Sequence, residues 1–531
     1  MIIRSAAALT VLLLCTSAAP APNPVNLALA AAMAANLCAS GEGTASASKV
    51  AGAVLVPGLT PAHMAASTIS QAQAFFDQGL GQLWGFDYDE ALKSFRRAGE
   101  LDPECALCGW GEALAMGPYV NSGAVDPAII AKARVLTARV LTSLTLSTRD
   151  RALVAALHAR YAPSGTNDNV RGDAYADTLA ALAARWPEDD TAAILAAEAI
   201  MTSQPWDYWE AGGRVPRARA GTALALIDTV LARAPDHPQA IHLLIHLTEA
   251  SANPERAAGP AARLGALAPA APHMVHMPSH TWYRLGQFDR AIADNQRAVA
   301  ADEAYARAVG DDPKNYGYFN HHTHFILSSA TQIGDRATAL AAADALEAAT
   351  PPIRVATSPW LEMRLITVLH ARAQFRSPAE LLALPMPDKR LQRLTLAWHG
   401  VRAEAQALAG NPEAARAELV LLRQVRDRIA KRRDGDMSFA AIADSVARGR
   451  IAAAQGDLPG ALAAWQAAEA IEANLPYAEP PMWPVPVSIL SGQARLAAGD
   501  AAGAAADFRR ALAQRPGNRA ALDGLANSAR S

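Results

Sequence analysis

Histidines are concentrated in one stretch of this 531-residue chain, and imidazole is the commonest protein ligand for transition metals. Eight of the 13 histidines fall between residues 242 and 324. His242 and His246 stand four residues apart, and so do His276 and His280. On a helix this spacing places both rings of a pair on one face, which is a standard way to supply two ligands to one ion. The pattern predicts a metal site built across neighbouring helices.

The complete set of candidate ligands adds one carboxylate and two further histidines to these pairs. The predicted metal ligands are His242, His246, Glu249, His276, His280, His321 and His324. Glu249 is also the candidate catalytic residue, because a carboxylate in this position can act as a ligand or as a general base. Many imidazoles with few thiolates favour copper, zinc or iron over calcium or magnesium. Six histidines in two sets could hold a pair of copper ions, whereas histidines with Glu249 and an open position could hold zinc or non-haem iron.

Some histidines have other interpretations. His273 and His322 lie off the two main stripes and are interpreted as orienting or structural residues. Pro278 falls between His276 and His280, where it removes a helical hydrogen bond. The helix is therefore either kinked there, or it begins at Met277 and leaves His273 and His276 in the preceding loop. For any single histidine, a hydrogen-bonded place in the core is the competing explanation.

Three more residues are candidates for contact with a substrate or for lining a groove. Arg284 lies one turn beyond His280 and could hold a substrate carboxylate, or it could be a solvated helix residue. Trp206 and Tyr208 could cover a pocket beside the histidines, or they could cap a junction between repeats. Cys105 and Cys108 form a C-x-x-C, which is interpreted as a structural disulfide or a packed thiol pair. A glycine-rich phosphate loop, a G-x-S-x-G turn and an H-E-x-x-H motif are all absent from the sequence.

A repeating pattern of small and large residues indicates how these side chains are positioned. Gly79, Ala91, Phe95, Ala98 and Pro103 have the spacing of one 34-residue repeat. The same spacing returns near the end of the chain, at Gly492, Gly499, Ala504, Phe508, Ala511 and Pro516. The chain therefore resembles tetratricopeptide-repeat proteins over much of its length. This resemblance implies an all-α fold, a right-handed α-solenoid of helical hairpins.

The resemblance also places the histidines within the repeats. With repeats starting at Pro238 and Pro272, each histidine pair takes positions 5 and 9, which line the concave groove in such proteins. A third repeat near Asn320 would add His321 and His324. The segments 105–111, 242–251 and 276–280 also resemble the CxxCxWG, HxxxHxxEAS and HMPSH segments of a group of bacterial tetratricopeptide-repeat proteins. That similarity implies that the three segments form one functional set.

Composition and targeting signals complete the outline. The formal net charge of −2 provides no basic surface for nucleic acid or an anionic membrane. Arg4, followed by a short apolar run, has the pattern of an export signal, so we expect a periplasmic or secreted protein without a membrane span. The expected regions are a signal peptide (1–30), a flexible leader (31–71), an N-terminal helical region (72–236), histidine-rich repeats (237–345) and C-terminal repeats (346–531).

Three functions are compatible with this pattern. The first is an exported metalloprotein with a copper, zinc or iron site on the concave face, possessing oxidoreductase activity toward a small substrate. The second is a scaffold whose groove binds a peptide or a partner protein without catalysis. The third is storage or delivery of a metal. The residue spacing does not separate the first from the third, because it cannot show whether a coordination position is open.

Overall fold

The computed structural model describes residues 52–122, 125–162, 168–350, 359–431 and 437–530, and its regular structure there is helical apart from one isolated bridge between Trp209 and Pro216. The N-terminal helices are α2 (Ser70–Trp84), α3 (Tyr88–Leu101), α4 (Ala106–Ala115), α5 (Pro127–Leu141), α6 (Thr148–Arg160), α7 (Asp168–Arg185), α8 (Asp190–Ser203) and α9 (Ala220–Arg233). The central helices are α10 (Pro238–Glu249), α11 (Ala258–Leu267), α12 (Pro272–His276), α13 (Pro278–Arg284), α14 (Phe288–Val309), α15 (Gly317–Ile333) and α16 (Arg336–Ala349). The C-terminal helices are α18 (Pro359–Phe375), α19 (Pro378–Leu382), α20 (Gln392–Leu408), α21 (Pro412–Ile429), α22 (Ser438–Ala454), α23 (Leu458–Glu472), α24 (Ser488–Ala497), α25 (Ala501–Gln514) and α26 (Arg519–Ser528).

The helices pair into hairpins through the small and large residues that the sequence repeats. A Cβ atom added to Gly79 would lie 2.9 Å from the ring of Phe95, and one added to Gly111 would lie 2.4 Å from it. Gly492 has the same relation to Phe508, at 2.8 Å. A buried aromatic ring thus fills the space that glycine leaves on the facing helices, and successive hairpins stack through such contacts. The expected all-α, tetratricopeptide-like solenoid is confirmed.

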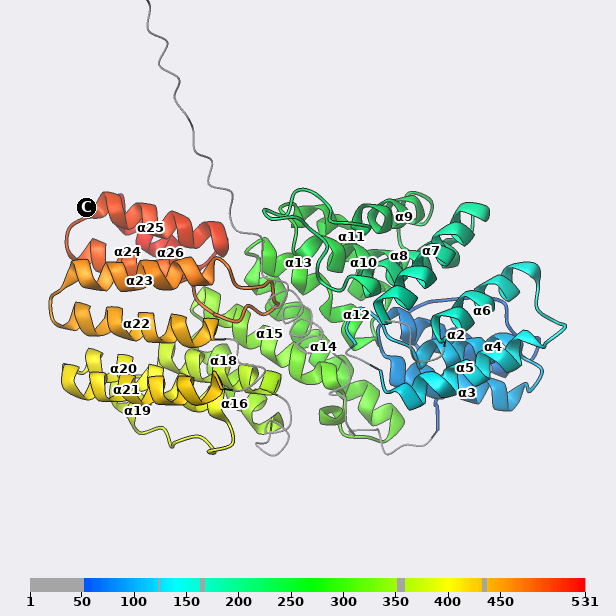
Figure 1. Ribbon diagram of the computed structural model, residues 1–531, viewed down its shortest axis with the longest axis horizontal. Coiled ribbons are helices and arrows are strands. Elements are labelled where there is room, and N and C mark those ends of the chain that lie inside the picture. Colours follow the sequence, from blue (N-terminus) through cyan, green and yellow to red (C-terminus); the bar gives the residue numbers. More distant parts are fainter. Residues whose placement is uncertain (1–51, 123–124, 163–167, 351–358, 432–436, 531) are drawn as a thin grey trace, which may run out of the picture.

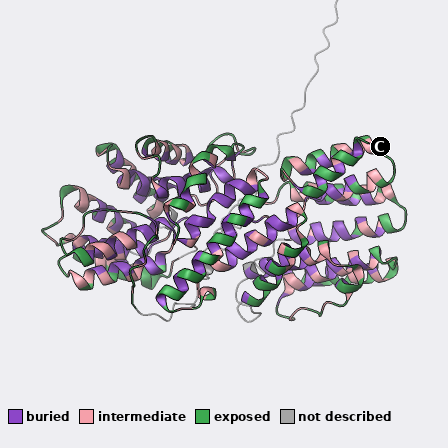
Figure 2. Ribbon diagram, turned by 180° about the vertical axis from the view of Figure 1, so that it is seen from behind, coloured by how far each residue is buried: buried purple, intermediate pink, exposed green. Residues whose placement is uncertain are grey.

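The histidine-rich helices lie in the middle of the molecule. Figure 1 places α12 to α15 between the N-terminal helices and the C-terminal helices. Helix α2 contacts α10, and α26 contacts α15, so elements from both ends of the described chain reach the centre. Buried residues follow the sides by which the helices face one another, and exposed residues follow the outer sides (Figure 2). The centre is therefore covered from two directions.

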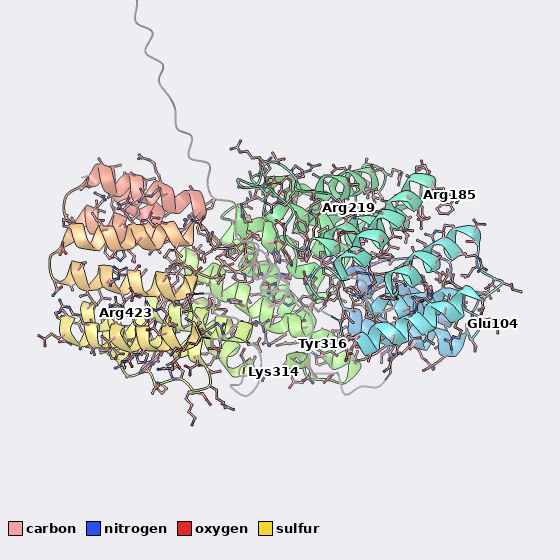
Figure 3. All side chains as sticks on the ribbon, viewed as in Figure 1. Glu104, Arg185, Arg219, Lys314, Tyr316 and Arg423 are labelled. Atoms are coloured by element: carbon pink, nitrogen blue, oxygen red, sulfur yellow. A yellow bond between two sulfur atoms is a disulfide. The ribbon has the colours of Figure 1, made fainter. Side chains whose placement is uncertain are left out.

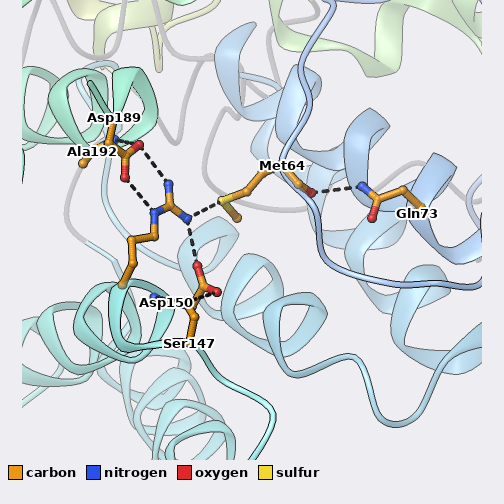
Figure 4. Close-up of polar contacts among 7 residues, drawn as sticks. Met64, Gln73, Ser147, Asp150, Asp189 and Ala192 are labelled. Atoms are coloured by element: carbon orange, nitrogen blue, oxygen red, sulfur yellow. Dashed lines mark hydrogen bonds and ion pairs between the residues drawn. The ribbon is translucent and has the colours of Figure 1, made fainter. Parts of the chain in front are cut away.

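The segment that precedes α2 is held against the N-terminal helices. Arg149 donates from Nη1 to Met64 Sδ at 3.0 Å, and its guanidinium also forms ion pairs with Asp150 and Asp189 (Figure 4). Gln73 Nε2 donates to the Met64 carbonyl at 3.0 Å. Residues near Met64 therefore pack on the fold, although they belong to the region expected as a flexible leader. The predicted signal peptide and leader residues 31–51 lie outside the described residues.

Two glycines bring the C-terminal repeat against the turn after α13. Gly286 has φ 72° and Gly517 has φ 76°, and a Cβ atom on Gly286 would lie 2.1 Å from the Pro516 carbonyl oxygen. Beside this contact, Asn518 Nδ2 donates to Gln332 Oε1 at 2.9 Å. The C-terminal repeat is thus joined to the central helices by a backbone approach that tolerates no side chain.

This contact makes a first prediction. Gly286→Ala is expected to lower the free energy of unfolding by about 3 kcal/mol or more, because a left-handed backbone and a backbone clash both oppose the methyl group. Gly310→Ala is the matched control, since Gly310 has φ 76° and no atom within 4 Å of the added Cβ. It should lose only about 1 kcal/mol. Urea unfolding of both variants measures the difference, and equal losses would show that the contact contributes nothing.

Charged side chains lie on the outside of the described fold. Glu104 and Arg185 are exposed and lie toward the outside of the N-terminal half (Figure 3). Among the described residues, every helix is too short or too polar to cross a membrane.

Candidate metal centre

Three neighbouring segments carry the clustered histidines, namely α10, the α12–α13 pair and α15. The eight side chains are 0–3% exposed: His242, His246, His273, His276, His280, His321, His322 and His324. A buried polar side chain normally finds a hydrogen-bond partner. Yet each of these histidines except His276 has at least one ring nitrogen without a hydrogen-bond partner. The interior of the protein thus contains an unusual concentration of imidazole nitrogens.

Six of the eight imidazoles gather into two sets of three. Trio A is His242, His246 and His273, and trio B is His276, His280 and His321. In each trio the three potential ligand nitrogens lie within 4.8 Å of one another. Nitrogens bound to one tetrahedral ion at about 2.0–2.1 Å lie roughly 3.3 Å apart, so modest side-chain adjustment closes either trio on an ion.

The break at Pro278 explains how one segment serves both trios. Helix α12 ends at His276 and α13 begins at Pro278, while Met277 between them keeps helical angles, φ −51° and ψ −38°. The segment is therefore a kinked helix, the first of the two possibilities that Pro278 allows. His273, His276 and His280 are then spaced three and seven residues apart, which is one side of a helix. His273, at the N-terminal end of this side, belongs to trio A, whereas His276 and His280 belong to trio B. The sequence analysis did not assign this role to His273.

Glu249 connects the two trios. Its Oε1 accepts a hydrogen bond from His246 Nδ1 at 3.0 Å, and its Oε2 lies 2.5 Å from His280 Nδ1. His246 belongs to trio A and His280 to trio B. Each carboxylate oxygen thus faces the Nδ1 atom of one imidazole. In proteins, a carboxylate beside the ring nitrogen that does not bind the metal commonly orients a metal-binding histidine.

A neutral oxygen orients a second imidazole in each trio. His242 Nδ1 donates to the carbonyl of Trp84, which ends α2, at 2.7 Å. His276 Nδ1 donates to Asn295 Oδ1 at 2.6 Å. The orientation of the Asn295 amide follows from its own Nδ2, which donates to the Ala291 carbonyl at 2.8 Å. Because an acceptor fixes the proton on Nδ1, the Nε2 lone pair of each ring is left for another partner.

One of these Nε2 atoms faces another imidazole nitrogen of its trio. His276 Nε2 and His280 Nε2 are 2.9 Å apart. Asn295 accepts the Nδ1 proton of His276, so His276 Nε2 carries a lone pair. A neutral His280 has one ring proton, and this proton cannot serve both His276 Nε2 and Glu249 Oε2. A cation bound by the two Nε2 atoms would remove this conflict. Protonation of His276 is disfavoured, because burial and the neighbouring His321 lower its pKa well below the ordinary value.

The electrostatics of the cluster favour neutral imidazoles around one charged carboxylate. Burial, followed by the nearby imidazoles, lowers the pKa values of His242, His273 and His321 well below the ordinary range. For Glu249, burial alone would raise the pKa, but His280 and His246 outweigh it and hold the pKa at about 2. At neutral pH the rings are therefore ready to bind a metal without first losing a proton.

Aromatic residues close each trio. The Phe86 ring centroid lies 4.2, 5.6 and 5.9 Å from the three imidazoles of trio A. The Phe325 ring centroid lies 4.8, 4.7 and 5.1 Å from the three imidazoles of trio B. Phe86 and Trp206 both contact His246, and both have left-handed backbones, φ 57° and 64°. Such strain in bulky residues is typical of functional sites.

The other candidate residues lie around the trios. His324 is in neither trio, and burial together with Arg364 lowers its pKa to about 3. His322 lies beside trio B, 4.8 Å from the His276 ring between centroids, and its Nδ1 pairs with Asp302 at 2.7 Å.

The predicted groove residues have mixed positions. Arg284 donates to the Ser251 carbonyl at 3.1 Å, and its guanidinium lies 5.5 Å from the centroid of the Tyr477 ring. The Trp206 ring lies nearly perpendicular to the His246 ring, with 5.3 Å between centroids, whereas the Tyr208 hydroxyl donates to the Met201 carbonyl at 3.3 Å. Trp206 is thus the one of the three that contacts a trio.

The two cysteines of the C-x-x-C motif form a disulfide with each other. Cys105 and Cys108 are joined as a disulfide at the start of α4. This is the structural disulfide among the alternatives that the sequence left open, and it is not part of either trio.

Comparisons with known proteins give little information about the function of this site. No protein-family model matches the chain, and no curated protein matches it. The solved human IFIT1 dimer with m7Gppp-AAAA is 13% identical, with 85% of this chain and 95% of the other covered and a TM-score of 0.34. Yeast Tom70 is 12% identical, covering 87% and 96%, with a TM-score of 0.25. The TPR domain of P58(IPK) is 11% identical, covering 86% and 97%, with a TM-score of 0.22. Likenesses this weak carry no argument about function.

Proposed function

We propose that this protein is a metalloprotein that binds transition-metal ions at trios A and B. The observation that carries the proposal is the 2.9 Å approach of the Nε2 atoms of His276 and His280, whose Nδ1 atoms face Asn295 and Glu249. A cation bound by both Nε2 atoms would leave the two Nδ1 protons for Asn295 and Glu249. In metal-binding histidines, one ring N–H commonly donates to an oxygen, which orients the ring and leaves the other nitrogen to bind the ion.

The types of ligand atom in the two trios limit which metals they can bind and which reactions a bound metal could catalyse. Each trio offers only imidazole nitrogen, which suits copper, zinc or iron and disfavours calcium and magnesium. Three protein ligands leave a coordination position to which a small substrate can bind, so we propose redox or metal-assisted chemistry on a small molecule. We assign Glu249 an orienting role in place of the ligand or base expected from the sequence, because both of its oxygens face imidazole Nδ1 atoms.

The scaffold alternative is less well supported. A peptide held in a concave groove would need side chains accessible on its surface, whereas the clustered imidazoles are 0–3% exposed. Storage or delivery of a metal without turnover remains the second candidate, because the same burial would protect a stored ion from water.

We also propose that the protein is exported. The Cys105–Cys108 disulfide supports this, because disulfides persist in oxidising compartments.

Metal content tests the main proposal. Protein purified without a histidine tag is expected to contain copper, zinc or iron in near-stoichiometric amount by elemental analysis. The double variant His246→Ala, His280→Ala removes one ligand from each trio and should lose the metal. His324→Ala is the matched control, because His324 is equally buried but belongs to neither trio. Wild-type protein that stays metal-free after incubation with copper, zinc and iron salts would overturn the proposal.

A further inference from the structure

The two trios are built to the same plan. His242 and His246 correspond to His276 and His280 after a shift of 34 residues, the length of one repeat. Each trio contains one ring that faces Glu249 and one ring held by a neutral oxygen. Each also contains a third ring, His273 or His321, without a hydrogen-bond partner on either nitrogen. One phenyl ring closes each set. The trios are therefore expected to bind the same kind of ion.

The trios also lie against each other. The ring centroids of His246 and His280 are 5.6 Å apart, and those of His273 and His276 are likewise 5.6 Å apart. One carboxylate faces a ring of each trio. Ions bound about 2 Å from these nitrogens would be close neighbours in a buried site, where their mutual repulsion is weakly screened.

The protein supplies little negative charge to offset two ions. The six side chains of the two trios are imidazoles, which carry no negative charge, and Glu249 provides one negative charge near both trios. The buried Glu479 also acts on His280, but burial raises its pKa to about 7. Asp302 reaches the cluster through His322, while Arg364 adds a positive charge near His321. Two divalent ions would therefore leave a large uncompensated charge inside the protein, which is strongly unfavourable.

We infer that trios A and B form one two-ion centre whose charge is completed by a small anion bound between the ions. The inference rests on the proposed metal binding and extends it to a ligand class, namely compact monoanions such as azide that can contact two metals at once. The anion occupies the coordination positions that three imidazoles leave open on each ion, so it marks the place at which a small substrate would bind.

Cobalt(II) and azide provide the test, because cobalt reports its ligands through visible absorption. Metal-free protein is titrated with cobalt(II) at about pH 7 in chloride-free buffer, with and without azide. We expect two ions per chain, and azide should raise the affinity for the second ion about tenfold or more while leaving the first little changed. One azide per two cobalt ions should alter the absorption spectrum.

Variants separate this inference from the proposed function. His242→Ala should bind one cobalt ion and lose the effect of azide, whereas His324→Ala should bind two ions with the full effect. Circular dichroism confirms that each variant retains its helices. Two ions that bind equally tightly with and without azide, or a single ion per wild-type chain, would overturn the inference and leave metal binding intact. Failure to bind any cobalt, copper, zinc or iron would overturn both.

Discussion

Replacing Glu249 by glutamine is expected to weaken metal binding at both trios, by about 10- to 100-fold at each. The carboxylate faces the Nδ1 atoms of His246 and His280, which belong to different trios. It fixes the orientation of both rings and increases their basicity. A glutamine side chain is neutral and has a single oxygen, so one ring loses its acceptor and the other ring keeps only a weaker hydrogen bond to an uncharged oxygen. Competition with a chelator of known affinity measures both binding constants.

Asn295→Ala is the matched comparison for this effect. Asn295 accepts from His276 alone, so its removal should weaken binding at trio B and leave trio A nearly unchanged. A Glu249→Gln variant that loses affinity for one ion only, or for neither, would show that the carboxylate is not shared between the sites. If Glu249 were a direct ligand of one ion, the loss would be confined to that ion.

Much of the fold could be predicted from the sequence, because the contacts that form the hairpins are local and repeated. Gly79 and Phe95 lie within one repeat, so their spacing is enough to predict that a ring packs on a glycine. The same holds for Gly492 and Phe508 in the last hairpins. What the repeat pattern could not provide is the approach of distant repeats, such as the contact of Gly286 with Pro516.

The candidate site was predictable where its ligands recur at helical spacing, and for His321 where the repeat resemblance placed it beside them. The pairs at His242 and His246 and at His276 and His280 follow from spacing alone, and they belong to trios A and B respectively. His273 was missed because it lies off the two stripes of histidines spaced four apart, although a separation of three and seven residues already places it on the same side as His276 and His280.

Apart from Glu249, the residues that contact the Nδ1 atoms of the rings could not be predicted from the sequence. The Trp84 carbonyl that holds His242 lies 158 residues earlier in the chain, and it becomes available because a helix end leaves carbonyls unpaired. Phe86 follows from the same turn, where a bulky residue takes a left-handed backbone that spacing does not reveal. These contacts depend on how the N-terminal repeats meet α10, and the sequence does not contain that geometry in any local pattern.

Acid is expected to destabilise the metal-free chain strongly below about pH 6.5. Burial lowers the pKa values of His242, His273, His276 and His321 well below 6.5 in the folded protein. As the pH falls, these histidines bind protons in the unfolded chain but not in the folded chain, so the free energy of unfolding decreases. Each such histidine should cost about 1.4 kcal/mol between pH 7.5 and pH 5.5, or roughly 5 kcal/mol for the four.

Bound ions should change this dependence, because a coordinated imidazole cannot accept a proton at the same nitrogen. Urea unfolding of metal-free and metal-loaded protein, measured at steps between pH 7.5 and pH 5.5, distinguishes the two cases. The metal-free chain should lose stability steadily over the interval. The loaded chain should keep its stability at first and lose it at the pH where the metal is released. Metal-free protein whose urea midpoint is unchanged across the interval would mean that these imidazoles are solvated, and a buried centre for two ions would then have no basis.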